Sequence, residues 1–381
     1  MAKQLQLIDK SKDYSIDNAN KGYLPGFQLY GQASYQSDVT QLPIALPNLP
    51  IEPLSRDQYR LYGELTQPIT DLFTLGDQKK VIAAAAQVET QKAEVELFKL
   101  RERINQLYFG ILLLEAQLEQ TELLKKDLQS GIEKTEVGIK NGVSLKSASD
   151  NLRAELLKAN QRSIELRAMK QAYTSMLSLL INKPITENTF FSKPATINPP
   201  SQNNRPEILL FALQKKSIDQ QIKLVDIKNL PRFSLYFQGG LGRPALNMLS
   251  NDFTGYYIAG IRLNWNLTSF YTSSQDKKIL RLNQKIVDVQ QEVFSFNTNI
   301  TYNQQSAEYQ KYVELIQTDK EIIGLRENHK VVMKNQLEYG TSTANDYMLA
   351  VHAQDQATLN LILHEIQLLH TQYSLLNTHG N

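Results

Sequence analysis

The sequence predicts a mainly α-helical fold with a smaller β component, built from two tandem copies of one structural unit. Prolines are absent from residues 69–183 and 245–381, and because a proline inside a helix costs about 3 kcal/mol, long helices can form there. Apolar residues in these stretches recur in alternating steps of three and four, which is the period of a coiled coil. Four shorter segments instead alternate apolar and polar residues, which is the period of a β-strand.

Residues 77–140 and 275–338 are the two longest predicted helices. The apolar seam of the first comprises Leu97, Leu100, Ile104, Leu107, Ile111, Leu114 and Leu118. The seam of the second comprises Ile286, Val289, Val293, Phe296 and Ile300. A third helix continues the pattern at Leu152, Leu156, Ala159, Leu166, Tyr173, Leu177 and Leu180. Such seams predict coiled-coil packing between long helices, with the faces rich in Gln, Lys and Glu turned to water.

Four segments predict β-strands, each with one apolar and one polar face: 27–36, 59–66, 232–241 and 253–267. They predict two hairpins, whose loops lie at 41–56 and 241–251. The strands are about ten residues long, which is the ~9–11 residues that a tilted membrane-spanning strand needs.

The two halves of the chain are copies of each other. Three pairs of segments match: 23–30 with 229–236, 77–80 with 275–278, and 141–144 with 339–342. The interval from Lys79 to Gly142 is 63 residues, and the interval from Lys277 to Gly340 is also 63. A helix of this length extends about 95 Å, far beyond the helices of an ordinary globular domain.

Each copy predicts a short helix, a β-hairpin, a very long helix, a tight turn and a returning helix. The predicted segments are short helices at 1–22 and 207–228, β-hairpins at 23–71 and 229–267, helical hairpins at 72–181 and 268–377, and a proline-rich linker at 182–206. The tandem repeats are therefore expected at 1–181 and 207–377.

Four such strands cannot hide their own edges. If each strand pairs only within its hairpin, the apolar faces and free edges require closure into a barrel. Bacterial barrels begin at about eight strands, so we expect a homotrimer with a twelve-stranded barrel, continued by the helices as a tunnel. Its lumen is predicted to be lined by Arg60, Glu64, Arg232 and Arg262.

The composition argues against several functional classes. The 41 basic and 39 acidic side chains give a formal net charge of +2, without the basic face that a nucleic-acid-binding protein needs. Cysteine is absent, which excludes disulfides and thiolate ligands. The five histidines form no pair at metal-binding spacing, and we find no phosphate-binding motif or catalytic constellation. We expect neither an enzyme nor a bound metal or cofactor.

Three features of the sequence together indicate one known family. These are the duplicated Leu-Pro-x-Phe-x-Leu-Tyr strand starts at 24–30 and 230–236, the long helices after Pro68 and Trp265, and the glycine turns at 142–144 and 340–342. In these features the sequence resembles the TolC-type outer-membrane efflux family. The resemblance covers essentially the whole chain. It implies a homotrimer with its barrel in outer-membrane lipid and its helical tunnel in the periplasm. It also implies passive efflux or type I secretion of drugs, metal ions or proteins, driven by an inner-membrane pump through a periplasmic adaptor.

The resemblance assigns a gate to the helix tips. The position that matches the family's constriction is Asp346, and three such carboxylates on the trimer axis would repel anions and attract cations. In the first repeat this position is Ala148, which leaves Asp150 as the nearest carboxylate. The family's second acidic position is Leu349 here and its arginine is Ser342, so the closing salt-bridge network departs from the family pattern.

Several of these residues have a second interpretation. Asp346 could instead be a first-turn acid favoured by the helix dipole. The turn residues are predicted to contact the adaptor, although the glycines could serve turn geometry alone: Asn141, Gly142, Val143, Ser144, Gly340, Thr341 and Ser342. Tyr256, Tyr257 and Trp265 predict an aromatic belt at the membrane interface, or ordinary strand packing.

The alternative function is a soluble periplasmic coiled-coil adaptor or structural protein. Its hairpins would bury their apolar faces in a small sandwich, whereas those of a channel expose them to lipid. The start of the chain also needs explanation. Glu207 aligns with Met1, and residues 1–14 lack the apolar region of a secretory signal. We therefore expect the native polypeptide to be longer and to have an export signal.

Overall fold

The computed structural model describes residues 2–40, 53–186, 189–195 and 204–380, and it confirms the predicted fold class. The elements follow in the order α1 (Ala2–Asn20), a 3-10 turn (Lys21–Tyr23), β1 (Gly26–Tyr35), β2 (Asp57–Pro68), α2 (Thr70–Lys140), α3 (Lys146–Ile181), α4 (Pro206–Lys228), β3 (Arg232–Arg243), β4 (Thr254–Asn264), α5 (Ser269–Glu338) and α6 (Ala344–Thr378). Over this described part of the chain, no helix combines the length and the apolar character needed to cross a membrane.

The long helices begin earlier than the predicted positions 77 and 275. α2 begins two residues after Pro68, and α5 begins shortly after β4. They contain 71 and 70 residues and are each about 105 Å long. They end at Lys140 and Glu338, where the sequence predicts the turns.

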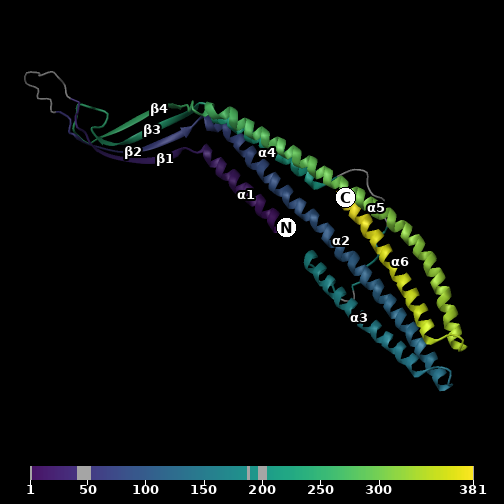
Figure 1. Ribbon diagram of the computed structural model, residues 1–381. Helices are drawn as coiled ribbons and strands as arrows, with labels where there is room; N and C mark the ends of the chain where they lie inside the picture. Colours follow the sequence, from purple (N-terminus) through teal and green to yellow (C-terminus); the bar gives the residue numbers. More distant parts are fainter. Residues whose placement is uncertain (1, 41–52, 187–188, 196–203, 381) are drawn as a thin grey trace, which may run out of the picture. The chain divides into compact units, whose positions relative to one another are not determined.

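The four strands form one antiparallel sheet in the order β1-β2-β3-β4 (Figure 1). The expectation that each strand pairs only within its own hairpin is therefore wrong, because β2 pairs with β3 over ten residue pairs. Hydrogen bonds fix this junction: the Ile69 N–H donates to the Phe233 C=O (2.8 Å), and the Thr70 hydroxyl donates to the Pro231 C=O (3.0 Å). A side chain at Gly240 would overlap the facing backbone of β2, so only glycine fits there.

The strand boundaries differ from the prediction by up to three residues, and β2 extends two residues further at each end than the predicted 59–66. β3 extends to Arg243 and so includes the first residues of the predicted loop 241–251. β4 ends at Asn264, so Trp265 and Leu267 follow the strand. Residues 41–52 of the other predicted loop lie outside the described residues.

The chain divides into two compact units. The first comprises Met1–Ala93 and Leu209–Gln291 and contains the sheet. The second comprises Glu94–Ile208 and Glu292–Asn381 and contains the helical hairpin turns. Both units draw on α2 and α5, since each of these helices passes through both.

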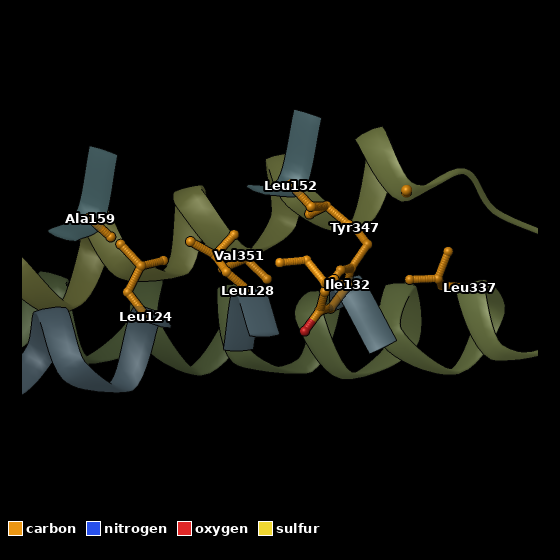
Figure 2. Close-up of a cluster of buried hydrophobic side chains, with 9 residues drawn as sticks. Leu124, Leu128, Ile132, Leu152, Ala159, Leu337, Tyr347 and Val351 are labelled. Atoms are coloured by element: carbon orange, nitrogen blue, oxygen red, sulfur yellow. The ribbon is translucent and has the colours of Figure 1, made fainter. Parts of the chain in front are cut away.

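Four helices of the second unit share a core near their turns, shown in Figure 2. Its buried residues are Leu124, Leu128, Ile132, Leu152, Ala159, Leu337, Ala344, Tyr347 and Val351. Tyr347 is 1% exposed, and its hydroxyl donates to the Asp127 C=O (3.3 Å). Gly131 leaves room for this ring, because a Cβ there would lie 2.9 Å from Tyr347 Cε1. The apolar side chains of α2 and α3 in the first repeat are therefore buried together with those of α5 and α6 in the second.

A second core holds part of the linker, whose residues 183–186 and 189–195 form neither helix nor strand. Phe191 is buried in a cluster with residues of α2, α3 and α6, and its ring meets Tyr108 edge to face. The Tyr108 hydroxyl donates to the Ser192 C=O (2.8 Å). The irregular linker segment is thus packed against the helices.

The predicted apolar seams have different environments. Leu107, Ile111 and Leu114 of α2 are buried. The seam of α5 is exposed along its whole length, at Ile286, Val289, Val293, Phe296 and Ile300, each at least half exposed. Because water-facing heptad positions are normally polar, the α5 seam is suited to contact another chain.

Replacing Tyr347 with alanine is expected to lower the free energy of unfolding by about 3–5 kcal/mol, because it opens a cavity among four helices. The control is Tyr339→Ala in the same unit, where the side chain is 83% exposed and the expected change is within about 0.5 kcal/mol. Chemical denaturation followed by circular dichroism measures both. Equal losses for the two variants would contradict the described core.

Candidate functional site

The first helical hairpin turns through a glycine with left-handed backbone geometry. α2 ends at Lys140, and Gly142 has a φ of 75°. The Gly142 N–H donates to the Ile139 C=O (3.1 Å), and the Val143 N–H donates to the Gly138 C=O (2.9 Å). These two bonds form a Schellman motif, which satisfies the last carbonyls of the helix.

The second hairpin repeats this geometry. α5 ends at Glu338, and Gly340 has a φ of 71°. The Gly340 N–H donates to the Leu337 C=O (3.2 Å), and the Thr341 N–H donates to the Gln336 C=O (2.9 Å). Both glycines are therefore required by the turn itself, since other residues rarely adopt this φ.

Asp346 caps the start of α6. Its backbone N–H donates to Thr343 Oγ1 (3.2 Å), while its carboxylate accepts from the Thr343 N–H (3.1 Å) and the Thr343 hydroxyl (2.6 Å). This reciprocal arrangement is a capping box. The hydrogen bonds from the Thr343 side chain and backbone lower the pKa of Asp346 below its ordinary value. Asp346 therefore has a structural role in addition to the predicted gate role.

The first tip lacks this cap. Leu145 occupies the position of Thr343 and forms no side-chain hydrogen bond to α3. Ala148 occupies the position of Asp346 and packs against the shared core. Asp150 lies exposed in the first turns of α3. The two tips are thus alike in backbone geometry and different in chemistry.

A groove of about 540 Å³ lies between the two tips within the second unit. Residues from both turns and from the starts of α3 and α6 line it: Val143, Ser144, Leu145, Ser147, Ala148, Asn151, Leu152, Gly340, Thr341, Ser342, Thr343, Ala344, Asn345, Asp346 and Met348. The structure therefore brings together most of the predicted tip residues. Asn141, Gly142 and Asp150 do not line this groove.

The polar face of the sheet centres on Glu64, which is 5% exposed. Its carboxylate accepts two hydrogen bonds from Arg262, at 2.7 and 3.2 Å, and one from Gln238. Thr66 donates a further hydrogen bond at 3.0 Å. The Arg262 guanidinium also lies over the Tyr236 ring, 4.5 Å from its centroid. Glu64 and Arg262, both predicted lumen residues, therefore form one neutral pair.

The other two predicted lumen residues do not take part in this pair. Arg60 is opposite Gln32 in the β1–β2 register, and Arg232 is opposite Asn264 in the β3–β4 register. No ion pair to either arginine is found within the described ranges. Sequence analysis did not identify Gln238 or Tyr236 as site residues, although both occupy polar-face positions.

The opposite face of the sheet is apolar and exposed. Its large exposed side chains include Phe27, Leu29, Leu61, Leu65, Phe233, Leu235, Phe237, Leu241, Tyr257, Ile261 and Leu263. They come from all four strands and share one face, since the register aligns Phe27 with Leu65 and Leu65 with Phe237. An apolar surface of this extent is typical of contact with lipid or protein.

The predicted aromatic belt requires one correction. Tyr256 and Tyr257 are adjacent in β4, so they lie on opposite faces, and the register aligns Tyr256 with Gly240 on the polar face. Tyr257 is 72% exposed on the apolar face. Trp265 follows the strand, and its indole N–H donates to the Asn229 C=O (3.0 Å). A belt on the apolar face can include Tyr257 and Trp265 but not Tyr256.

The described residues contain no group of three or more His, Asp or Glu side chains that could hold a metal ion. No protein-family model matches the sequence, and no curated protein matches it either.

Solved structures match along nearly the whole chain. CusC, whose structures concern transmembrane channel formation, is 13% identical with a TM-score of 0.74, over 99% of this chain and 89% of its own. The outer membrane protein VceC of Vibrio cholerae is 13% identical with a TM-score of 0.70, over 99% and 92%. The open-state MtrE outer membrane channel of Neisseria gonorrhoeae is 14% identical with a TM-score of 0.71, over 99% and 86%. The chain therefore has the TolC-like channel fold that the sequence predicts.

Thr343→Ala is expected to weaken the start of α6 by about 1 kcal/mol at neutral pH, because it removes the cap. Since the pKa of Asp346 is lowered in the folded state, its contribution is present above the ordinary pKa and is lost as the pH falls through the folded pKa. The cost of Thr343→Ala should therefore shrink as the pH falls from neutral through the ordinary Asp pKa and below it.

Amide hydrogen exchange of residues 344–347 measures this effect across the pH range. Leu145→Ala is the matched control, because Leu145 holds the same position in the first turn without capping α3. Equal effects of the two substitutions, or a cost of Thr343→Ala that does not change with pH, would contradict the capping role.

Proposed function

We propose that this chain is the subunit of an outer-membrane channel, a passive exit duct without enzymatic activity. The observation that supports this most strongly is the open sheet, which exposes an apolar face and pairs polar groups on the other. In water such a face would be costly, at roughly 25 cal/mol for each Å² of apolar surface. In a barrel wall the same face contacts lipid, and the polar face lines a water-filled lumen.

The proposed assembly is a homotrimer. β1 and β4 are the outer strands of the sheet, so each has one edge without a partner in the described chain. Because β1 and β4 run antiparallel in the alternating sheet, β4 of one subunit can pair with β1 of the next. Three copies would close a barrel of twelve strands, and the exposed α5 seam offers a second surface for subunit contact.

The strand lengths support a position in the outer membrane. They contain 10, 12, 12 and 11 residues, which suits a tilted membrane-spanning strand. The solved outer-membrane channels with this fold add to the case. Tyr257 and Trp265 would then contact the lipid interface.

The helix tips are the proposed docking site for a periplasmic adaptor, which would connect the duct to an inner-membrane pump. The groove between the tips supports this, because it presents backbone and hydroxyl groups of both turns on one surface. Asp346 and, in the other repeat, Asp150 are the proposed sources of negative charge at the closed end. In this proposal the pump supplies the energy, and the channel supplies the path.

The alternative of a soluble adaptor is less well supported. That hypothesis requires the hairpins to bury their apolar faces against each other in a sandwich. The four strands instead lie in a single sheet with this face exposed.

Purified protein in planar bilayers tests the proposal. We expect detergent-dependent trimers that conduct, and Asp346→Ala should increase the frequency of opening severalfold, because it removes the capping box that holds the start of α6. Asp13→Ala removes an exposed helix carboxylate in the other unit and should leave opening unchanged. Trimers that never conduct, even with Asp346→Ala, or a monodisperse monomer in buffer without detergent, would contradict the channel function.

A further inference from the structure

The polar face of the sheet has an excess of positive charge. Among all residues that face this side from the four described strands, the charged ones are Arg60, Glu64, Arg232 and Arg262. The opposite face has one acid and one base, Asp57 and Arg243, and these two form an ion pair with each other. The sheet therefore has unbalanced charge on one face only.

One cation of the polar face is neutralised and two are not. Arg262 is paired with Glu64, whose remaining hydrogen-bonding capacity is taken by Gln238 and Thr66. The Glu64 carboxylate is thus buried and already hydrogen-bonded, so it does not neutralise Arg60 or Arg232. Arg60 and Arg232 form no ion pair with any residue that the structure describes, which leaves two positive charges for each chain.

These two arginines lie near opposite ends of the sheet. Pro68 and Arg262 are both opposite Ser234, and Arg232 is two residues closer to the helices. Arg60 is eight residues from Pro68 along β2. With a rise of about 3.3 Å per residue, roughly 33 Å of sheet separates the two free arginines, with the neutral pair between them.

Tyrosines accompany the arginines on this face. Tyr30 and Tyr62 stack with their ring centroids 5.0 Å apart, and Tyr236 and Tyr256 share the same side of the sheet. Their hydroxyl groups can donate hydrogen bonds. The face is therefore rich in donors and poor in anionic acceptors.

We propose that the barrel section of the pore selects for anions. This inference rests on the proposed trimeric channel, in which Arg60 and Arg232 would each form a ring of three uncompensated guanidinium groups. Rings of arginine favour the passage of anions, and guanidinium binds carboxylate, sulfate and phosphate groups well. The solutes that this section favours are thus those with such groups. This preference of the barrel section for anions is opposite to the preference for cations that is expected from Asp346 at the helix tips.

The test is the reversal potential of the full chain in planar bilayers under a KCl gradient, measured with Asp346→Asn and Asp150→Asn together so that both proposed tip carboxylates are absent. We expect chloride to be more permeant than potassium. Arg60→Gln combined with Arg232→Gln should lower the chloride-to-potassium permeability ratio by about threefold. Arg60→Lys with Arg232→Lys keeps the charge and should keep the preference. Asp57→Asn with Arg243→Gln is the control, because it removes an ion pair from the opposite face.

The outcomes separate the two proposals. A protein that forms no pore would overturn the proposed function and the inference with it. A conducting pore that prefers potassium, or whose ratio does not change when Arg60 and Arg232 are replaced by glutamine, would overturn the anion selectivity alone. If the control variant, Asp57→Asn with Arg243→Gln, changed the permeability ratio equally, the anion selectivity would also be overturned, because the effect would then not come from the polar face.

Discussion

The constraint on which this structure depends is the solvation of one sheet with two unlike faces. Its apolar face extends over all four strands and has no cover within the described chain, while its polar face is joined by hydrogen bonds around Glu64. A single copy cannot satisfy both faces in water. Both faces are satisfied in the wall of a membrane barrel, where lipid contacts the apolar face and water contacts the polar face. The proposed trimer and its proposed place in a membrane both rest on this one property.

The fold was predictable from the sequence because its elements have strong periods. Alternation of period two defined the strands and their faces, and steps of three and four defined the long helices. The continuous sheet was not predictable, because it depends on contacts far apart in sequence. Gly240 permits close approach to β2, and Thr70 binds the backbone at the start of β3. Neither residue has a local pattern that indicates such a role.

The candidate site was predictable in part. The turn glycines were evident from their duplicated motifs, and their left-handed geometry agrees with a turn. The pairing of Arg262 with Glu64 was not evident, because the two residues lie in strands that are not neighbours and the long arginine side chain reaches diagonally across β3. Tyr256 and Tyr257 were predicted to lie in one belt, but adjacent residues of a strand point to opposite faces of the sheet. Thr343 and Asp346, which are the N-cap and the third residue of α6, were a capping signal visible in the sequence.

The unequal capping of the two helical hairpins has a consequence for symmetry. In a ring of three chains, six tips would share nearly sixfold backbone geometry, yet capped and uncapped tips would alternate around the circle. A binding protein arranged around such a ring would meet two kinds of contact in turn. Six identical copies of it could bind only by adjusting to quasi-equivalent environments, whereas an ancestral chain with a single hairpin would have presented one environment six times. Duplication within one polypeptide thus allows each tip to specialise while the common scaffold is retained.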